Sequence, residues 1–195
     1  MEQQNARFSA AVLAGGLSSR MGRDKAALPF DGTTLLAFQV EKLRALGIKD
    51  IMISGSERQI PGTRPISDVY PRKGPLGGIH ACLAAAKGAA VLFLGVDTPL
   101  IPPEALQTLL SAHENGVTLL QHGNRAEPLF GVYDCALAPL CEEILRTEHT
   151  GVWQLLNRTA VKTLPFDGDE TLFTNGNTPE EYARLLQLWE RKERP

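Results

Sequence analysis

The 195-residue sequence is poor in the features that mark several common classes of protein. It has 3 cysteines, Cys82, Cys135 and Cys141, an odd number without CxxC spacing, so neither a disulfide framework nor a zinc site is expected. No apolar run approaches the roughly 18 residues that a membrane helix needs. Residues 1–5 are acidic and amide-rich, which is not typical of a signal peptide. These absences predict a soluble, cytoplasmic protein.

The chain also has little excess charge of either sign, with 20 Lys+Arg against 22 Asp+Glu and a formal net charge of −2. A balance of this kind gives no overall field that would drive binding to nucleic acid or to a membrane surface. With 43% hydrophobic residues the chain has enough apolar material to fold, and one domain of this length buries roughly 70% of its unfolded surface. The composition predicts one globular domain without nucleic-acid or membrane partners.

Two familiar nucleotide-binding signatures are absent. A Walker A loop has the form GxxxxGK[ST], whereas here five residues separate Gly16 from Gly22 and Arg23 follows. The GxGxxG fingerprint of dinucleotide-binding folds is not found either. The sequence therefore gives little support to nucleotide hydrolysis at a P-loop or to hydride transfer at a Rossmann-type dinucleotide site.

What the sequence does have is a regular alternation of short apolar runs with helical patterns, which is typical of βαβ units. The most apolar run, 89–96, predicts a central strand buried on both faces. The clearest helix start is Thr178, which forms a capping box with Glu181. We therefore predict a single three-layer α/β domain, a mostly parallel mixed sheet with helices on both faces. The expected strands are 8–13, 48–54, 64–67, 89–96, 117–121, 128–133, 161–164 and 171–173, and the expected helices begin near Thr33 or Thr34, Pro75, Pro102, Leu137 and Thr178.

Residues 13–25 form a glycine-rich loop at the carboxyl end of the first expected strand, where open parallel sheets bind ligands. The paired glycines Gly15 and Gly16 let the backbone present bare N–H groups to an anion. Arg20 and Lys25 add cations within the same loop. This combination favours a cradle for a triphosphate over the alternative, a glycine-rich turn with solvated charges.

Two carboxylates and a glycine turn follow other expected strands. Asp97 follows the most apolar expected strand, 89–96, where it either supplies one ligand of Mg²⁺ beside phosphate oxygens or caps the next turn. Asp68 ends its own strand and either contacts a base, a ribose or metal-bound water, or belongs to a surface turn. Gly77 and Gly78 lie at a helix start, where bare amide N–H groups can donate to a purine carbonyl or a phosphate. The alternative for them is a turn that needs glycine.

Five sequence blocks together resemble the molybdenum cofactor guanylyltransferases, which belong to the nucleotidyltransferases with a Rossmann-like GT-A fold. The first block alone indicates only the superfamily, whereas five in this order are more specific and span nearly the whole chain. The resemblance implies one nucleotidyltransferase domain over 1–195, with a tail at 1–7, a nucleotide-binding half at roughly 8–115 and an acceptor-binding half at roughly 116–195. The blocks are LAGGxSxRMGxDK at 13–25, GPLGG at 74–78, DTPLIPP at 97–103, EPLF at 127–130 and NGNTPEE at 175–181.

The resemblance implies that GTP and molybdenum–molybdopterin give the guanine dinucleotide cofactor and pyrophosphate, with Mg²⁺ as cofactor. Ser54 stands at a strand end where the family often has asparagine, so that contact stays open. The resemblance gives nucleotide binding to Leu13, Ala14, Gly15, Gly16, Lys25, Asp68, Gly77, Gly78 and Asp97. It assigns catalysis to Arg20, Lys25 and Asp97, metal binding to Asp97, and acceptor binding to Asn175 and Asn177. From the local sequence alone, Asn175 is a turn former and Asn177 is the residue before a helix cap.

Three other functions stay open at this point. A cytidylyltransferase acting on the same pterin is the nearest, although LAGG at 13–16 and GPLGG at 74–78 favour guanine. A sugar-1-phosphate nucleotidyltransferase shares the opening loop. A non-catalytic nucleotide-binding delivery protein would use the same pocket without releasing pyrophosphate. Transient contacts with molybdopterin-handling proteins or recipient molybdoenzymes are expected only through the resemblance.

Overall fold

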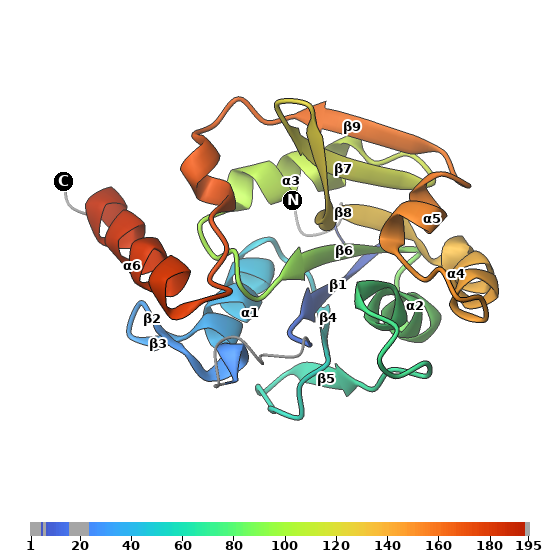
Figure 1. Cartoon of the computed structure of the whole chain (residues 1–195), viewed down its shortest axis with the longest axis horizontal. Coiled ribbons are helices and arrows are strands. Elements are labelled where there is room, and N and C mark those ends of the chain that lie inside the picture. Colours follow the sequence, from blue (N-terminus) through green and yellow to red (C-terminus); the bar gives the residue numbers. More distant parts are fainter. Residues whose placement is uncertain (1–4, 6, 16–23, 194–195) are drawn as a thin grey trace.

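A seven-stranded sheet with the order β5-β4-β1-β6-β8-β7-β9 runs through the computed structural model, which describes residues 5, 7–15 and 24–193 (Figure 1). Every neighbouring pair is parallel except those that involve β8, which is antiparallel to both β6 and β7. β2 and β3 form a separate small hairpin. The strands are β1 Phe8–Leu13, β2 Pro29–Phe30, β3 Thr33–Thr34, β4 Asp50–Ser54, β5 Thr63–Ile66, β6 Ala90–Gly95, β7 Val117–His122, β8 Arg125–Asp134 and β9 Val161–Pro165.

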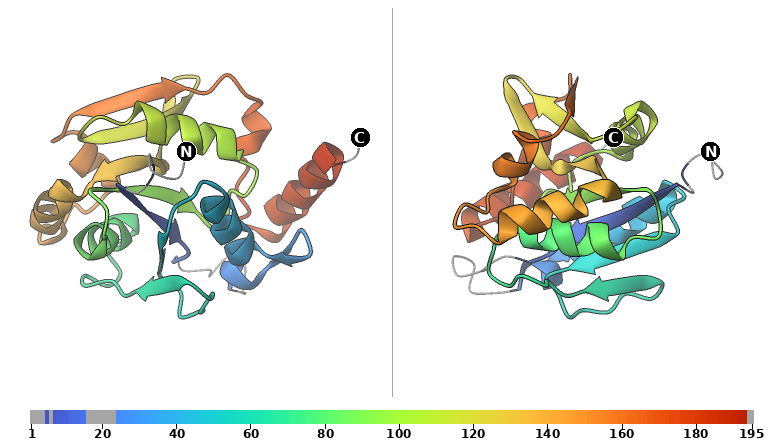
Figure 2. Two further views of the ribbon diagram at one scale, coloured as in Figure 1. Left: turned by 180° about the vertical axis from the view of Figure 1, so that it is seen from behind. Right: turned by 90° about the vertical axis from the view of Figure 1, so that its right-hand side faces the viewer.

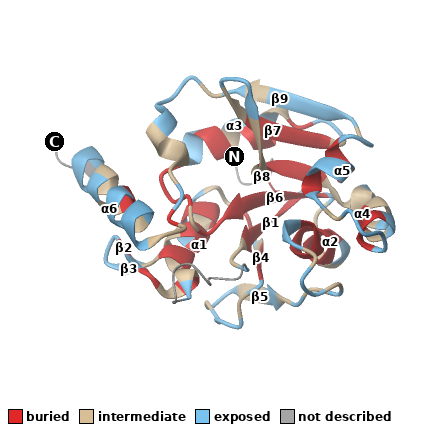
Figure 3. Cartoon of the chain, in the orientation of Figure 1, coloured by how far each residue is buried: buried red, intermediate tan, exposed pale blue. Residues whose placement is uncertain are grey.

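Helices cover both faces of the sheet, so the predicted three-layer α/β domain is confirmed (Figures 1 and 2). Alternate residues of β6 face opposite sides: Leu92 and Leu94 join the core under α1 and α3, whereas Val91 and Phe93 join the core under α2, α4 and α5. Figure 3 shows the buried residues concentrated in the sheet and in the helix sides that face it. The helices are α1 Leu35–Ala45, α2 Pro75–Ala85, α3 Pro103–Ala112, α4 Ala138–Leu145, α5 Val152–Leu156 and α6 Pro179–Glu193, with 3-10 turns η2 Lys25–Ala27, η3 Cys135–Leu137 and η4 Glu170–Phe173.

Local chemistry fixes where the helices begin. Thr34 caps α1, since its Oγ1 accepts a hydrogen bond from Ala37 N at 3.2 Å. At α6 the predicted capping box is confirmed: Thr178 Oγ1 accepts from Glu181 N, and Glu181 Oε2 accepts from Thr178 N, both at 3.2 Å. The buried Leu185 then anchors α6 to the core beneath α1.

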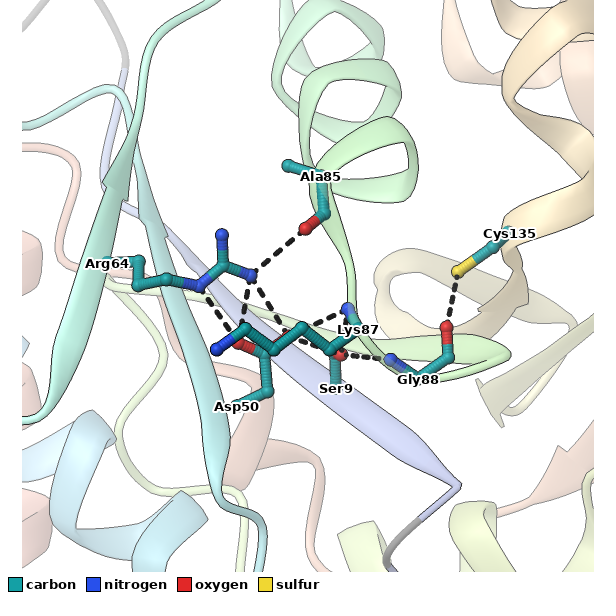
Figure 4. A network of polar contacts seen from close by, with 7 residues as sticks. All are labelled: Ser9, Asp50, Arg64, Ala85, Lys87, Gly88 and Cys135. Carbon is teal, nitrogen blue, oxygen red and sulfur yellow. Dashed lines mark hydrogen bonds and ion pairs between the residues drawn. The ribbon is translucent and has the colours of Figure 1, made fainter.

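Side chains of Ser9, Asp50 and Arg64 form a polar clamp between the amino ends of β1, β4 and β5, opposite the carboxyl ends of these strands (Figure 4). The Asp50 carboxylate accepts from Ser9 Oγ at 2.6 Å and from Arg64 Nε at 2.9 Å, and the Lys87 backbone N–H donates to it at 3.0 Å. Burial raises the pKa of this carboxyl, but the hydrogen bonds from Ser9, Lys87 and Arg64 and the charge of Arg64 together lower it by more than burial raises it. The net shift of the pKa is therefore downward. The polar clamp thus joins the amino ends of three neighbouring strands.

The expected strand at 171–173 is wrong: these residues lie in the 3-10 turn η4, whose start is fixed by Asp169 Oδ1 accepting from Thr171 N at 2.9 Å. The β2–β3 hairpin and α5 were not predicted. The remaining predicted strands and helices are found within a few residues of their expected positions. Within the described part of the chain, no helix combines the length and apolar character needed to cross a membrane.

Candidate nucleotide site

A cavity of about 600 Å³ opens where β1, β4 and β6 end, at the carboxyl edge of the parallel strands. The loop before α2 and Leu129 of β8 complete its walls. Gly77 lies in the first turn of α2 beside the cavity, and Gly16 and Arg20 lie outside the described residues. The predicted site residues that line it are Leu13, Ala14, Gly15, Lys25, Asp68, Gly78 and Asp97.

Three segments far apart in the sequence meet at one side of this cavity. Lys25, at the start of η2, places its Nζ 3.2 Å from Asp97 Oδ2, just after β6. The same ammonium donates to Asn177 Oδ1, and the Gly176 N–H donates to the Asp97 carbonyl at 3.0 Å. Asn177, predicted on the acceptor side, therefore lies against Lys25, whereas Asn175 is exposed.

Gly95 makes room for the Asp97 carboxylate. A Cβ placed on Gly95 would stand 2.9 Å from Asp97 Oδ1 and 3.5 Å from Thr98 Oγ1. The carboxylate thus folds back over a bare Cα at the last residue of β6. Sequence reasoning missed Gly95; the available signal was a glycine two positions before an aspartate at the end of the most apolar strand.

The floor of the cavity is bare backbone. A Cβ on Gly15 would lie 2.9 Å from the Cα of Gly55, so the chain after β1 passes directly against the chain after β4. Gly55 has φ 76°, a left-handed conformation that favours glycine. The Ala14 N–H donates to the Ser54 carbonyl at 2.9 Å and holds the two segments together. Backbone this close leaves room for a flat or anionic ligand above it.

At the other end of the cavity Asp68 faces the first turn of α2. Ser54 Oγ lies 3.4 Å from Asp68 Oδ1, and burial raises the pKa of the Asp68 carboxyl against the lowering effect of that hydrogen bond. A Cβ on Gly78 would stand 2.5 Å from Ser54 Oγ, and one on Gly77 would stand 3.0 Å from the Tyr70 carbonyl. Both glycines are therefore needed for α2 to begin this close to β4 and Asp68.

Arg72 is a cavity residue that sequence reasoning missed. It is exposed and adopts φ 62°, an uncommon backbone conformation for a residue with a side chain. Among the described residues that line the cavity, the cations are Lys25 and Arg72, on the side of Asp97 and on the side of Asp68 respectively. A polyanion in the cavity would contact positive charge at both ends.

The donor set near Asp97 suits Mg²⁺ that arrives with phosphates. The described part of the chain contains no cluster of three or more His, Cys, Asp or Glu side chains able to hold a metal. Asp97 instead offers a single carboxylate, 24% exposed, at the cavity wall. Mg²⁺ usually takes one or two protein carboxylates and completes its shell with waters and substrate phosphates. Asp97 fits that role, and the metal itself stays a prediction.

Known proteins match this chain over most of its length. Residues 10–163 match the family described as the MobA-like NTP transferase domain. The chain is 31% identical over 194 residues to a protein of Carboxydothermus hydrogenoformans named probable molybdenum cofactor guanylyltransferase, covering 95% of this chain and 98% of that protein. It is 30% identical over 190 residues to the molybdenum cofactor guanylyltransferase of Xanthomonas euvesicatoria pv. vesicatoria, covering 92% and 94%.

The fold is shared with a solved structure from an archaeon. The crystal structure of molybdopterin-guanine dinucleotide biosynthesis protein A from Archaeoglobus fulgidus superimposes with a TM-score of 0.79 at 24% identity, covering 94% of this chain and 99% of that one. At this identity the likeness establishes the arrangement of the strands and helices.

Proposed function

The chain belongs to the MobA-like NTP transferase domain family, and we propose that it transfers GMP from GTP to the terminal phosphate of molybdenum–molybdopterin. The products are molybdopterin guanine dinucleotide and pyrophosphate. Membership of the family and the curated relatives make the protein a nucleotidyltransferase enzyme. The guanine donor and the pterin acceptor are proposed from the names of those relatives and from the sequence blocks.

The observation that carries the proposal is the junction of Lys25, Asp97 and Asn177 at the wall of the cavity. A cation and a carboxylate beside bare backbone are what a triphosphate donor and its metal require. The chain after β1 supplies Lys25, the chain after β6 supplies Asp97, and the segment before α6 supplies Asn177. Residues from both predicted halves of the chain thus meet at one point, where donor and acceptor would have to meet.

The chemistry needs no general base from the protein. The attacking acceptor phosphate is already ionised near neutral pH, so the barrier lies in bringing two anions together in line and neutralising the charge that moves to pyrophosphate. Lys25 supplies a fixed positive charge at the cavity wall, and Arg20 is proposed to add a second. When bound, Mg²⁺ held by Asp97 would polarise the phosphate oxygens.

Lys25 changes partners in this proposal. In the structure its ammonium is held by Asp97 Oδ2 and Asn177 Oδ1. A triphosphate in the cavity would compete for the same ammonium with several charged oxygens, and the Asp97 carboxylate would then be available to hold the Mg²⁺ ion. Asn177 then keeps Lys25 oriented, and its amide group stays at the boundary with the acceptor.

The base end of the cavity is proposed to hold the guanosine. Leu13, Ala14 and Gly15 would lie along the nucleoside, and the side-chain-free surface of Gly77 and Gly78 would lie beside the base, since the Gly77 N–H itself donates to the Gly74 carbonyl at 3.1 Å. The Asp68 carboxylate, 3.4 Å from Ser54 Oγ, would accept hydrogen bonds from the base or the ribose. A base with N–H donors matches this carboxylate acceptor.

The test is a competition assay. Purified protein receives Mg²⁺, molybdenum–molybdopterin and all four nucleoside triphosphates, and the product is identified by mass together with pyrophosphate. A guanine dinucleotide with matching pyrophosphate is expected. A cytosine dinucleotide would contradict the guanine assignment and keep the reaction. Folded protein that binds GTP but forms no dinucleotide would contradict the proposal in favour of nucleotide delivery, or of a sugar-phosphate acceptor if added sugar phosphate restores pyrophosphate release.

Two further expectations concern the protein in the cell; the first of them rests on the same proposal. The finished dinucleotide would pass by transient contact to proteins that handle the pterin or incorporate the cofactor. A cytoplasmic location stays a prediction from the sequence.

A further inference from the structure

Two polar residues of α1 are buried under the strand that leads to Asp97. Gln39 is 0% exposed and Lys42 is 7% exposed. They lie three positions apart and so share one side of the helix, among Leu36, Val40 and Leu43, which are fully buried in the core. Burying an amide and an ammonium costs free energy that an apolar residue would avoid. Their presence needs a reason beyond packing.

The side chains donate to the backbone on both sides of Asp97. Lys42 Nζ donates to the carbonyls of Pro99 at 2.6 Å and Ile101 at 2.7 Å. Gln39 Nε2 donates to the carbonyl of Gly95 at 2.7 Å and reaches that of Thr98 at 3.3 Å. One helix therefore holds carbonyls two positions before Asp97 and one, two and four positions after it.

This segment has few backbone hydrogen bonds of its own. β6 ends at Gly95 and α3 begins at Pro103; between them the Val96 N–H donates to the Leu13 carbonyl at 3.1 Å, and the Asp97 carbonyl accepts from the Gly176 N–H at 3.0 Å. Thr98 and Ile101 are nevertheless buried, and buried carbonyls must find donors. The Lys42 and Gln39 side chains supply donors to the carbonyls of Gly95, Thr98, Pro99 and Ile101, so α1 holds residues 95–101 in addition to the backbone bonds of Val96 and Asp97.

Two buried polar atoms in the same place remain without a hydrogen-bond partner among the described residues: Gln39 Oε1 and Thr98 Oγ1. Such atoms cost stability, so the polar contact is kept although it is not fully satisfied. Thr98 Oγ1 would lie 3.5 Å from a Cβ on Gly95, next to the Asp97 carboxylate. Thr98 Oγ1 is thus an unsatisfied polar atom directly beside the residue predicted to hold the metal.

We propose that Gln39 and Lys42 are positioning residues that fix the Asp97 carboxylate and thereby set the affinity of the nucleotide complex for its divalent cation. The inference deepens the proposed function and rests on it. Neither residue reaches the cavity; each acts through the backbone carbonyls of residues 95–101. Groups that orient a ligating carboxylate commonly change metal affinity by about tenfold to a hundredfold.

The experiment measures Mn²⁺ binding by electron paramagnetic resonance with the whole protein and GTP, without any pterin, beside thermal melting followed by circular dichroism. The variants are Lys42→Met and Gln39→Met, which keep length and remove the donors. Val40→Ala is the matched control: it weakens the same helix by truncating a fully buried side chain that donates no hydrogen bond. Lys49→Met removes an exposed lysine near the end of that helix.

The expected result is about tenfold weaker Mn²⁺ binding in Lys42→Met and Gln39→Met, with GTP binding in the absence of metal little changed. Val40→Ala melts at a lower temperature and keeps wild-type Mn²⁺ affinity, and Lys49→Met keeps both. If Lys42→Met does not fold, Gln39→Met and the milder Gln39→Asn decide the question.

Folded variants with wild-type Mn²⁺ affinity would overturn the inference, as would a Val40→Ala protein that loses as much affinity as they do. Wild-type protein that binds no Mn²⁺ with GTP would overturn the proposed function together with the inference. Because no acceptor is present, an error in the pterin assignment alone leaves the measurement unaffected.

Discussion

Lys25 Nζ lies 3.2 Å from Asp97 Oδ2, an ion pair between residues 72 positions apart in the sequence. The two side chains are 18% and 24% exposed, so the pair stands at the cavity wall and not in the core. Its position beside bare backbone makes it the centre of the proposed chemistry.

Lys25→Ala and Asp97→Ala should each lose most turnover and stay folded. Removing one positioned charge from a phosphoryl-transfer site costs on the order of a hundredfold or more in rate. The measurement is pyrophosphate release at saturating GTP, with melting by circular dichroism as the check on folding. Lys49→Ala, which removes an exposed lysine, should keep wild-type turnover. Near-normal turnover in either Lys25→Ala or Asp97→Ala would remove that residue from the mechanism.

Gly95→Ala should impair turnover through Asp97. The added Cβ would stand 2.9 Å from Asp97 Oδ1, closer than real contacts allow, so the carboxylate must turn away. We expect a turnover loss of about tenfold or more, with a weaker response to added Mg²⁺. Gly151→Ala is the matched control, since a Cβ there meets nothing within 4 Å and Gly151 has an ordinary φ of −70°. Equal turnover in the two variants would show that Gly95 does not constrain Asp97.

Gly78→Ala should weaken GTP binding and leave turnover at saturation less affected. Its Cβ would stand 2.5 Å from Ser54 Oγ, so the Ser54 hydroxyl must turn away from Asp68, or α2 must shift at the base end of the cavity. Adding Ser54→Ala removes that oxygen and should restore part of the affinity. The measurement is GTP binding by calorimetry for both single variants and the double variant. If the double variant binds GTP no more tightly than Gly78→Ala, the loss of affinity does not arise from the contact with Ser54.

The buried ammonium of Lys42 should make stability rise with pH. Burial, aided by the charge of Lys192, lowers the pKa of Lys42 from 10.5 to about 7 in the folded protein. Between these values the unfolded chain binds more protons than the folded one, so the free energy of unfolding increases as pH rises, and the full cost of the buried charge is felt below pH 7.

Urea unfolding across this pH range is the measurement, read as the difference between wild type and Lys42→Met. The difference is needed because burial raises the pKa of the Cys82 and Cys141 thiols to about 12, which lowers stability at high pH in both proteins. A difference that does not change with pH would mean that Lys42 keeps its ordinary pKa when folded.

The sequence was sufficient for elements whose cause is local. The run at 89–96 is apolar on both faces because β6 is covered on both sides, and the Thr178–Glu181 capping box is readable from spacing alone. The triplet 171–173 was not readable, because three apolar or β-branched residues fit a short strand as well as a 3-10 turn, and the Asp169 cap decides between them.

Residues whose role depends on distant partners were missed. Gln39 and Lys42 look like part of a solvated helix face, and only the carbonyls of residues 95–101 explain their burial. His113 is buried because Thr118 Oγ1 and Asp134 Oδ1 each lie 3.0 Å from its ring nitrogens. Likewise, nothing local to residues 175–177 indicates that Asn177 meets Lys25.

That last contact bears on how the protein is made. Lys25 and Asp97 are synthesised well before residues 176 and 177, which hold the Lys25 ammonium and the Asp97 carbonyl. A nascent chain with its parallel strands already paired therefore still lacks part of the proposed catalytic wall, which is completed only once residues 176 and 177 have been synthesised. The matched family region, 10–163, also stops short of it. A fragment cut to that region would lose the first two residues of β1 and the last two of β9, and would leave the ammonium without one of its two partners.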